Sequence, residues 1–300
     1  MSCFPKTRFN DSAFRYDDQY TLSMTYTDAA SKKTRTSQIT KSVASFFDEN
    51  GVLCMYLYQP EVKMLKNNVS VSKKELQRLG TPYKFKGSPQ SVVCVSHDTL
   101  CVTGGGGYKA VCLLSVSTDN TITLTREIKT SSKFDSLCCM SPSHMVVSTM
   151  DNPRPARMLS LDGVENDFDH VVFPTKTYKA NESLCTYVQS KNTLVLTDRN
   201  AHTVFLYDTV KGTSRAVTNE NIQEPCGCCV GPGDTVLVCS ENNNSIVHLS
   251  VDGKILGIYP VDMLFPRSIC VSKNATRLAV SNSPKDAKKL QMYNISPANS

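Results

Sequence analysis

The chain has 300 residues, of which 40% are hydrophobic and 20% charged, and its formal net charge is +6. This length and apolar content suffice to bury a full core. No run of about 18 apolar residues is present, so the sequence predicts no transmembrane helix. Residues 1–18 lack the apolar core of a secretory signal, so the expected location is cytoplasmic.

A polar turn followed by an apolar run recurs along the chain, at residues 48–56, 96–104, 141–149 and 190–198, and again within the gapless pair 225–240 and 266–281. A period of about 40 residues with several apolar runs per unit is typical of four-stranded propeller blades. The sequence therefore predicts an all-β, six-bladed β-propeller, with residues 1–300 as one domain. The predicted blade anchors are Lys41, Pro89, Phe134, Ser183, Pro225 and Pro266.

The two ends of the chain are predicted to meet in one blade. The last unit ends at Ser300 without its fourth strand, whereas residues 1–40 precede the first unit and include a strand-like stretch at 20–27. We expect this N-terminal segment to complete the last blade and close the ring, because closure removes an unpaired sheet edge. Helix is scarce, and residues 73–80 are the only short candidate, with a polar turn as the equal alternative.

The 13 cysteines raise the question of a metal site. Most fall in the first or second predicted strand of a blade, where cysteine behaves as a small buried hydrophobe. Cys226, Cys228 and Cys229 lie close together, but a structural zinc site usually pairs two such knuckles and no second one is present. We therefore expect core packing, reduced thiols, and neither metal nor cofactor.

An enzyme of this architecture would need ligands or catalytic groups around the central channel. The predicted innermost strands carry neither carboxylates nor histidines. Asp135, Glu182 and Glu224 precede these strands and are interpreted as solvated loop charges, while His202 and His248 are interpreted as loop and outer-strand residues. No catalytic residue is predicted, and a metal-dependent hydrolase or lyase remains an alternative.

Residues 197–208, with Asn200 and His202 in a loop, and residues 239–257 resemble the NHL repeat. The chain is similar to the C-terminal propellers of TRIM–NHL proteins. In that family the propeller selects the partner or substrate, and a RING finger carries ubiquitin ligase activity. This sequence shows no RING or B-box array and no coiled coil. The resemblance therefore implies a non-catalytic recognition module, with single-stranded RNA binding, known for some NHL propellers, as the alternative.

The loops that join second to third strands, and fourth strands to the next blade, share one face of a propeller. In this sequence they are rich in basic residues, which favours an acidic protein or peptide partner, or nucleic acid. Few aromatics and no tryptophan are available to stack bases, which favours the protein partner. Arginine offers bidentate hydrogen bonds. The predicted partner-binding residues are Arg154, Arg157, Arg199, Arg267, Lys109 and Tyr108. No membrane partner is expected, and the oligomeric state is left open.

Overall fold

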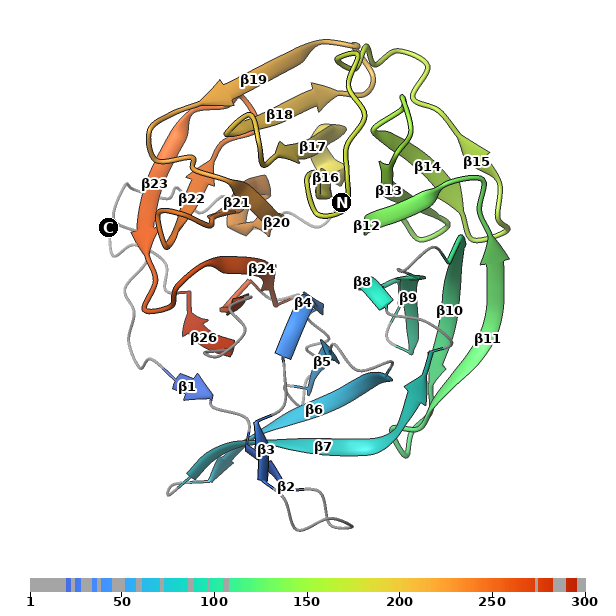
Figure 1. The fold of residues 1–300 in the computed structure, drawn as a ribbon, viewed down its shortest axis with the longest axis vertical. Helices are drawn as coiled ribbons and strands as arrows, with labels where there is room; N and C mark the ends of the chain where they lie inside the picture. The colour runs from blue at the N-terminus through green and yellow to red at the C-terminus, as the bar shows by residue number, and fades with distance from the viewer. Residues whose placement is uncertain are drawn as a thin grey trace, which may run out of the picture.

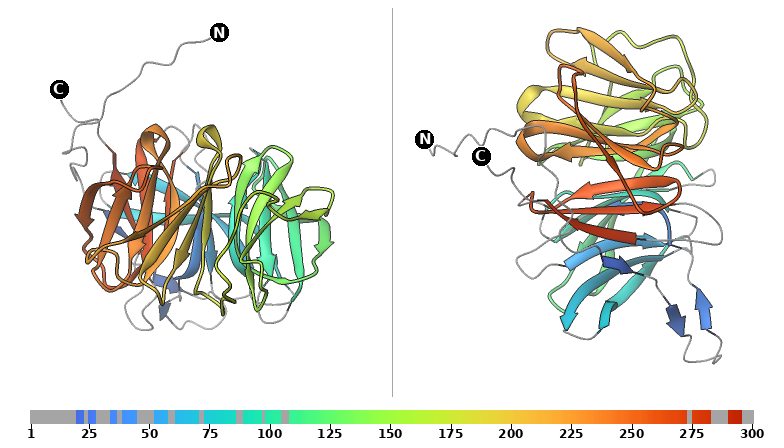
Figure 2. Two further views of the ribbon diagram at one scale, coloured as in Figure 1. Left: turned by 90° about the horizontal axis from the view of Figure 1, so that it is seen from above. Right: turned by 90° about the vertical axis from the view of Figure 1, so that its left-hand side faces the viewer.

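The computed structural model describes residues 20–22, 25–27, 34–36, 39–44, 52–57, 61–70, 73–85, 89–96, 98–104, 108–272, 275–282 and 290–295. Four-stranded antiparallel sheets are arranged radially around a central axis (Figure 1) and form a disc when seen from the side (Figure 2). The predicted all-β propeller is confirmed. Within the described ranges, the helical elements are the short 3-10 turns Gln189–Lys191 and Pro232–Asp234, and none of these ranges holds a helix able to span a membrane.

The first two sheets lie at the bottom and lower right of Figure 1. From the axis outward, the first consists of β4 (Ile39–Ala44), β5 (Val52–Leu57), β6 (Glu61–Ser70) and β7 (Lys73–Lys84). The second consists of β8 (Pro89–Cys94), β9 (Thr99–Gly104), β10 (Ala110–Val116) and β11 (Ile122–Lys129).

The next three sheets repeat this order. The third consists of β12 (Lys133–Ser141), β13 (His144–Met150), β14 (Ala156–Ser160) and β15 (Glu165–Asn166). The fourth consists of β16 (Cys185–Val188), β17 (Thr193–Asp198), β18 (Thr203–Asp208) and β19 (Ser214–Thr218). The fifth consists of β20 (Pro225–Gly231), β21 (Thr235–Ser240), β22 (Ser245–Leu249) and β23 (Ile255–Pro260).

The remaining sheet combines both ends of the chain. Its order is β24 (Pro266–Val271), β25 (Arg277–Asn282), β26 (Leu290–Asn294) and β1 (Tyr20–Leu22). Strand β1 runs antiparallel to β26, with Tyr20 opposite Met292 and Leu22 opposite Leu290. Strands β2 (Thr25–Thr27) and β3 (Thr34–Thr36) form a separate two-stranded ribbon, so only the first part of the strand-like stretch 20–27 joins the sheet.

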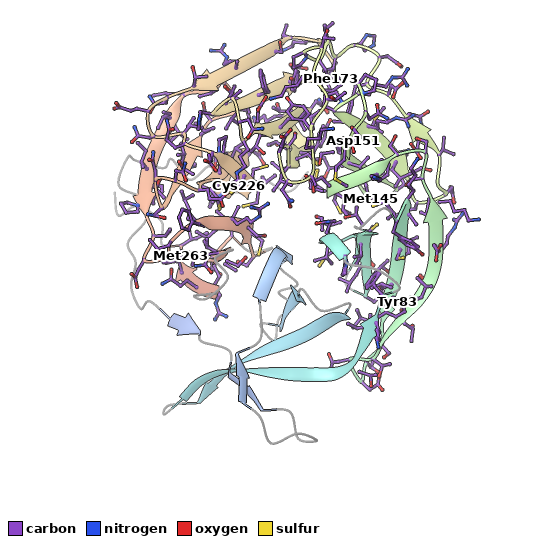
Figure 3. The ribbon with its side chains drawn as sticks, viewed as in Figure 1. Tyr83, Met145, Asp151, Phe173, Cys226 and Met263 are labelled. Carbon is purple, nitrogen blue, oxygen red and sulfur yellow. The ribbon has the colours of Figure 1, made fainter. Side chains whose placement is uncertain are left out.

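A sheet that packs between two neighbouring sheets is buried on both faces, which explains why the sequences of its strands are continuous apolar runs. In β13, Met145 and Val147 pack against the second sheet, whereas Val146 between them packs against the fourth. This alternation follows from the two-residue period of a strand. Cys226 and Met263 share the cluster between the fifth and last sheets; both are labelled with Met145 in Figure 3. The hydrophobic core is thus a series of layers between neighbouring sheets.

The blade anchors coincide with irregular strand starts. Innermost strands begin at Pro89, Pro225 and Pro266, as the repeat suggests, and elsewhere at Ile39, Lys133 and Cys185. The register shifts just after such starts, between Pro89 and Ser91, Phe134 and Ser136, Pro225 and Cys228, and Pro266 and Ser268. Proline lacks an N–H group and is tolerated at the first residue of a strand and at bulges. The recurring proline therefore marks where the second, fifth and last sheets enter the channel wall.

Gly227 allows the fifth and last sheets to approach closely near the axis. A Cβ atom at this position would lie 2.3 Å from the carbonyl oxygen of Arg267 and 2.9 Å from the Cα atom of Ser268. Both contacts are to backbone, so a side chain here would push two sheets apart.

The short helix predicted for residues 73–80 is wrong, as is the alternative polar turn. These residues belong to β7, which pairs with β6 from Ser70–Lys73 to Glu61–Lys84. Leu, Gln, Glu and Lys are good helix formers, but intrinsic propensity is a weak preference that pairing with a neighbouring strand overrides.

Candidate functional site

The innermost strands enclose a cavity of about 280 Å³ at the axis of the propeller. Its described walls come from β8, β12, β16, β20 and β24. The wall is unusually rich in sulfur: the lining thiols are those of Cys94, Cys138, Cys185, Cys228, Cys229 and Cys270. None of the described cysteines forms a disulfide. Among the described residues, no group of three or more His, Cys, Asp or Glu side chains is placed to hold a metal ion.

Two of these thiols are in direct contact. The Sγ atoms of Cys138 and Cys185 lie 3.9 Å apart, on neighbouring innermost strands. Ser136 Oγ lies 3.3 Å from the Cys185 Sγ and donates a hydrogen bond to it. Burial by itself would raise the pKa of the Cys185 thiol, but the hydrogen bonds from Cys138 and Ser136 outweigh it and lower that pKa. The same contact with Cys185, together with burial, raises the pKa of Cys138.

Asp135 is the carboxylate that the structure places in the cavity wall. Its exposed fraction is only 3%, and the backbone N–H of Asn181 donates a hydrogen bond to it across two blades. The interpretation of Asp135 as a solvated loop charge is therefore wrong. A carboxylate this deeply buried needs such donors to offset its lost hydration, so Asp135 links the third sheet to the entrance of the fourth.

The two histidines discussed above make structural contacts. His202 Nδ1 accepts a hydrogen bond from the backbone N–H of Glu224 at 2.9 Å. His248 is buried, and its Nε2 lies 2.8 Å from Thr235 Oγ1. Because the Thr235 hydroxyl donates to the carbonyl of Pro232, His248 acts as the donor in this contact. Burial lowers the pKa of His248 to about 4, so the ring is neutral at physiological pH.

Arg154 and Arg157, two of the predicted partner-binding residues, contact acids of their own blade. Both form ion pairs with Asp167, and Arg157 also pairs with Glu165. The Arg157 side chain is 13% exposed, whereas that of Arg154 is 59% exposed. Arg157 also donates to Ser131 Oγ at 2.8 Å, on the connection from the preceding blade. Arg157 thus ties two blades together, and Arg154 remains available at the surface.

Arg199 and Arg267 converge on a single carboxylate. The Nη2 atom of Arg199 lies 3.2 Å from Glu241 Oε2, and the Nη1 atom of Arg267 lies 3.7 Å from the same oxygen. Arg199 also donates from Nε to Glu224 at 2.9 Å. The side chains of Glu241 and Arg267 are only 5% and 10% exposed. This cluster joins three successive blades, and its charges are largely balanced internally.

Lys109 and Tyr108, the other predicted partner-binding residues, lie directly before β10. Lys109 is exposed, and its Nζ donates to the carbonyl of Ser131 at 3.3 Å. Tyr108 is half-buried and packs on the core of the second sheet. Burial and a hydrogen bond with Glu127 raise the pKa of the Tyr108 phenol. Lys109 and Arg157 thus share contacts with Ser131, whereas Arg199 and Arg267 form a separate cluster around Glu241.

The loop between β23 and β24 exposes apolar side chains that were not among the predicted partner-binding residues, although Phe265 counts among the few aromatics of the predicted loops. Leu264 and Phe265 there are 57% and 41% exposed. Side-chain amides brace the loop backbone: Asn244 accepts from the Phe265 N–H at 2.8 Å, and Asn282 donates to the Leu264 carbonyl at 3.0 Å. Phe265 has a φ of 55°, a left-handed conformation that bulky residues rarely adopt. In the sequence, the signal for this loop is an aromatic residue directly before the anchor proline Pro266.

The matches to known protein families concern the N-terminal part of the chain. Residues 6–67 match the family model of the microsomal signal peptidase 25 kDa subunit. Over 67 residues the chain is 34% identical to signal peptidase complex subunit 2 of Drosophila melanogaster. The aligned region covers 22% of this chain and 34% of that protein. The chain thus spans about a third of the length of the curated relative it matches.

Solved structures are similar to this chain over 93% of its length. A protein of unknown function from Bacteroides thetaiotaomicron VPI-5482 has a TM-score of 0.67, 11% identity and 77% of its own chain covered. A streptogramin B lyase has a TM-score of 0.58, 13% identity and 87% covered. Virginiamycin B lyase from Staphylococcus aureus has a TM-score of 0.59, 11% identity and 89% covered. At these identities the likeness shows the propeller fold alone.

Proposed function

We propose that this propeller is a non-catalytic recognition module that binds a protein or peptide on one face, formed by the loops between the second and third strands of each blade and by the blade-to-blade loops. The observation that carries the proposal is the braced loop of Leu264 and Phe265. Its apolar side chains are exposed while its backbone is fixed by Asn244 and Asn282. A rigid exposed aromatic is the kind of anchor that dominates protein interfaces, because little entropy is lost on binding.

The strained backbone of Phe265 supports the same proposal. A bulky residue at φ 55° costs free energy, and such conformations persist where the surroundings over-determine them, often at binding sites. The short connection from β23 to β24 runs from an outermost strand to the next blade, so Phe265 belongs to the face of the blade-to-blade loops.

The charged residues of this face favour an acidic partner. Arg154 and Lys109 are exposed and serve as rim contacts in this proposal. The other three arginines contribute mainly by holding blades together. The charges of Arg157, Arg199 and Arg267 are already balanced by acidic side chains of the propeller itself. The predicted contact residues Arg154, Arg157, Arg199, Arg267, Lys109 and Tyr108 thus enter the proposal with different roles.

Single-stranded RNA is the less supported partner. Of the loop aromatics available for base stacking, Tyr178 is buried at 1% exposure and donates to Asp198, and Tyr108 is half-buried. Base stacking needs an open ring face, so Phe265 is the better placed of these three. The hydrolase or lyase alternative stays a prediction, without a candidate metal group among the described residues.

The finer identity of the propeller is part of the same proposal. We infer a ring of six blades of the NHL type, closed by the N-terminal strand, as in the TRIM–NHL propellers that the sequence resembles. The pairing of β1 with β26 supports the closure. In such a setting the chain would select substrates for a ubiquitin ligase in the cytoplasm, with the ligase activity supplied by another protein or domain.

Affinity capture with matched baits tests the recognition proposal. The full chain is compared with Phe265→Asp and with Val210→Asp, because Val210 is 63% exposed on the β18–β19 turn of the opposite face. We expect proteins captured by the wild type to be lost with Phe265→Asp and retained with Val210→Asp. Equal capture by both variants would refute the assignment. Binding of random single-stranded RNA at low salt, lost with the same Phe265 variant, would favour RNA instead.

A second proposal rests on the N-terminal match. Residues 6–67 include β4, β5 and most of β6, so the matched segment overlaps the first sheet of the propeller. We propose that this segment associates with a signal peptidase complex. Co-purification of that complex with the full chain from microsomes is the expected result, and its absence under mild detergent would refute the association. Phe265→Asp leaves this outcome unchanged, which separates the two proposals.

A further inference from the structure

The Cys138 and Cys185 thiols meet across a boundary between blades. Their strands, β12 and β16, belong to separate sheets, yet the two Sγ atoms are 3.9 Å apart. A disulfide has a sulfur–sulfur distance of about 2.05 Å, so bond formation requires an approach of about 2 Å. Since side-chain rotation and small backbone shifts supply movements of this size, the two sulfurs are within reach of each other.

The hydrogen bonds around this pair distinguish Cys185 from the other thiols. Its Sγ lies 3.3 Å from the Ser136 hydroxyl and 3.9 Å from the Cys138 thiol, both donors to it, and 3.7 Å from the carbonyl oxygen of Val146. Two donors aimed at one sulfur favour its thiolate form. Cys138 is at the same time the nearest thiol and a donor, which is the position of a resolving cysteine.

The neighbouring thiols are less suited to react. Cys139 donates instead to the carbonyl of Cys94 at 3.1 Å, and burial raises its pKa to about 11. Burial likewise raises the pKa of Cys228 and of Cys229 well above the ordinary value. Oxidation of cysteine follows thiolate character and access. Cys185 and Cys138 both line the axial cavity, whose volume admits a small oxidant.

We propose that Cys185 and Cys138 form a peroxide-oxidised pair whose reversible disulfide staples the third blade to the fourth inside the channel. The Cys185 thiolate attacks one oxygen of hydrogen peroxide, so an S–O bond forms as the O–O bond breaks, and the released hydroxide takes a proton to become water. The Cys138 thiol then loses its proton and attacks the Cys185 sulfur. The S–S bond forms, the S–O bond breaks, and a second water leaves.

The balance of this reaction is two thiols and one peroxide giving one disulfide and two waters. The two sulfurs together lose two electrons, and the peroxide oxygens gain them. As a result the third and fourth blades, otherwise joined here by packing and by hydrogen bonds such as Cys185 N–H to Ser136 Oγ at 2.8 Å, acquire a covalent link near the axis. We expect the oxidised chain to melt several degrees above the reduced chain, because the link restricts the unfolded state. The proposal is independent of the partner-binding face.

Peptide mapping of the full chain tests the proposal. Trypsin releases residues 134–157, which contain Cys138 and Cys139, and residues 180–191, which contain Cys185. After treatment of the reduced protein with equimolar hydrogen peroxide, we expect these two peptides to appear cross-linked, with a mass lower by two hydrogens, and to separate on reduction. Fragmentation of the cross-linked pair then assigns the bond to Cys138 rather than Cys139, with no substitution needed.

Matched variants give a second readout. Cys139→Ser is the control and is expected to keep the cross-link. Cys138→Ser is expected to lose it and to accumulate Cys185 sulfenic acid, trapped as a dimedone adduct, whereas Cys185→Ser loses both products. A cross-link that persists in folded Cys138→Ser, or wild-type oxidation that proceeds at other cysteines while the pair stays reduced, would overturn the proposal.

Discussion

Neutralising Glu241 should destabilise the contact between three blades. The carboxylate faces Arg199 at 3.2 Å and Arg267 at 3.7 Å, and its side chain is 5% exposed. At an effective dielectric constant of about 20, unit charges 3.7 Å apart attract by roughly 4.5 kcal/mol. Glutamine is cheaper to desolvate, which offsets part of this loss, and Arg199 keeps Glu224. We therefore expect Glu241→Gln to lower the free energy of unfolding by about 2–3 kcal/mol.

Urea unfolding measures this change directly, and a thermal melt should shift by roughly 5 °C, since larger domains lose about 2 °C per kcal/mol. The matched control is Lys179→Ala, because Lys179 pairs with Asp151 at 2.7 Å but both side chains are largely exposed. Exposed pairs contribute little, so no measurable change is expected there. Equal stability of the Glu241 and Lys179 variants would refute the reasoning.

Further predictions concern close packing and pH. Gly227→Ala places a Cβ 2.3 Å from the Arg267 carbonyl and should lower the melting temperature clearly more than Gly257→Ala, whose nearest contact is the end of the Tyr259 side chain. His248 has a pKa near 4 when folded and about 6.5 unfolded, so the unfolded chain binds more protons in between. Stability should fall by about 3 kcal/mol as pH drops across this interval. A His248→Gln variant with an equally steep urea-unfolding profile would contradict this.

The repeating architecture could be predicted because each blade is made of local hairpins. Turns and apolar runs close together in sequence encode such hairpins, and the anchor prolines Pro225 and Pro266 mark strand starts that tolerate a missing N–H group. The pairing of β1 with β26 followed from a similar count of strands. Helix propensity misled at residues 73–80, where pairing with β6 decides the conformation.

The site could not be predicted to the same extent, because it depends on contacts between blades. Residues 138 and 185 meet only through lateral packing of neighbouring sheets, which no local pattern encodes. The arginines were identified as basic loop residues, but their acidic partners, such as Glu241 beside Arg267, become visible only in three dimensions. The presentation of Phe265 likewise depends on Asn244, 21 residues earlier in the chain.

Photo-crosslinking tests the central claim, that the blade-to-blade loop face binds the partner, most directly. A benzophenone amino acid replaces Leu264 in the full chain, and in a second sample it replaces Val210, which is exposed to a similar extent on the opposite face. Illumination in cell extract is predicted to give a discrete cross-linked partner from position 264 and none from position 210. The same adduct from position 210, or adducts from position 210 alone, would contradict the account.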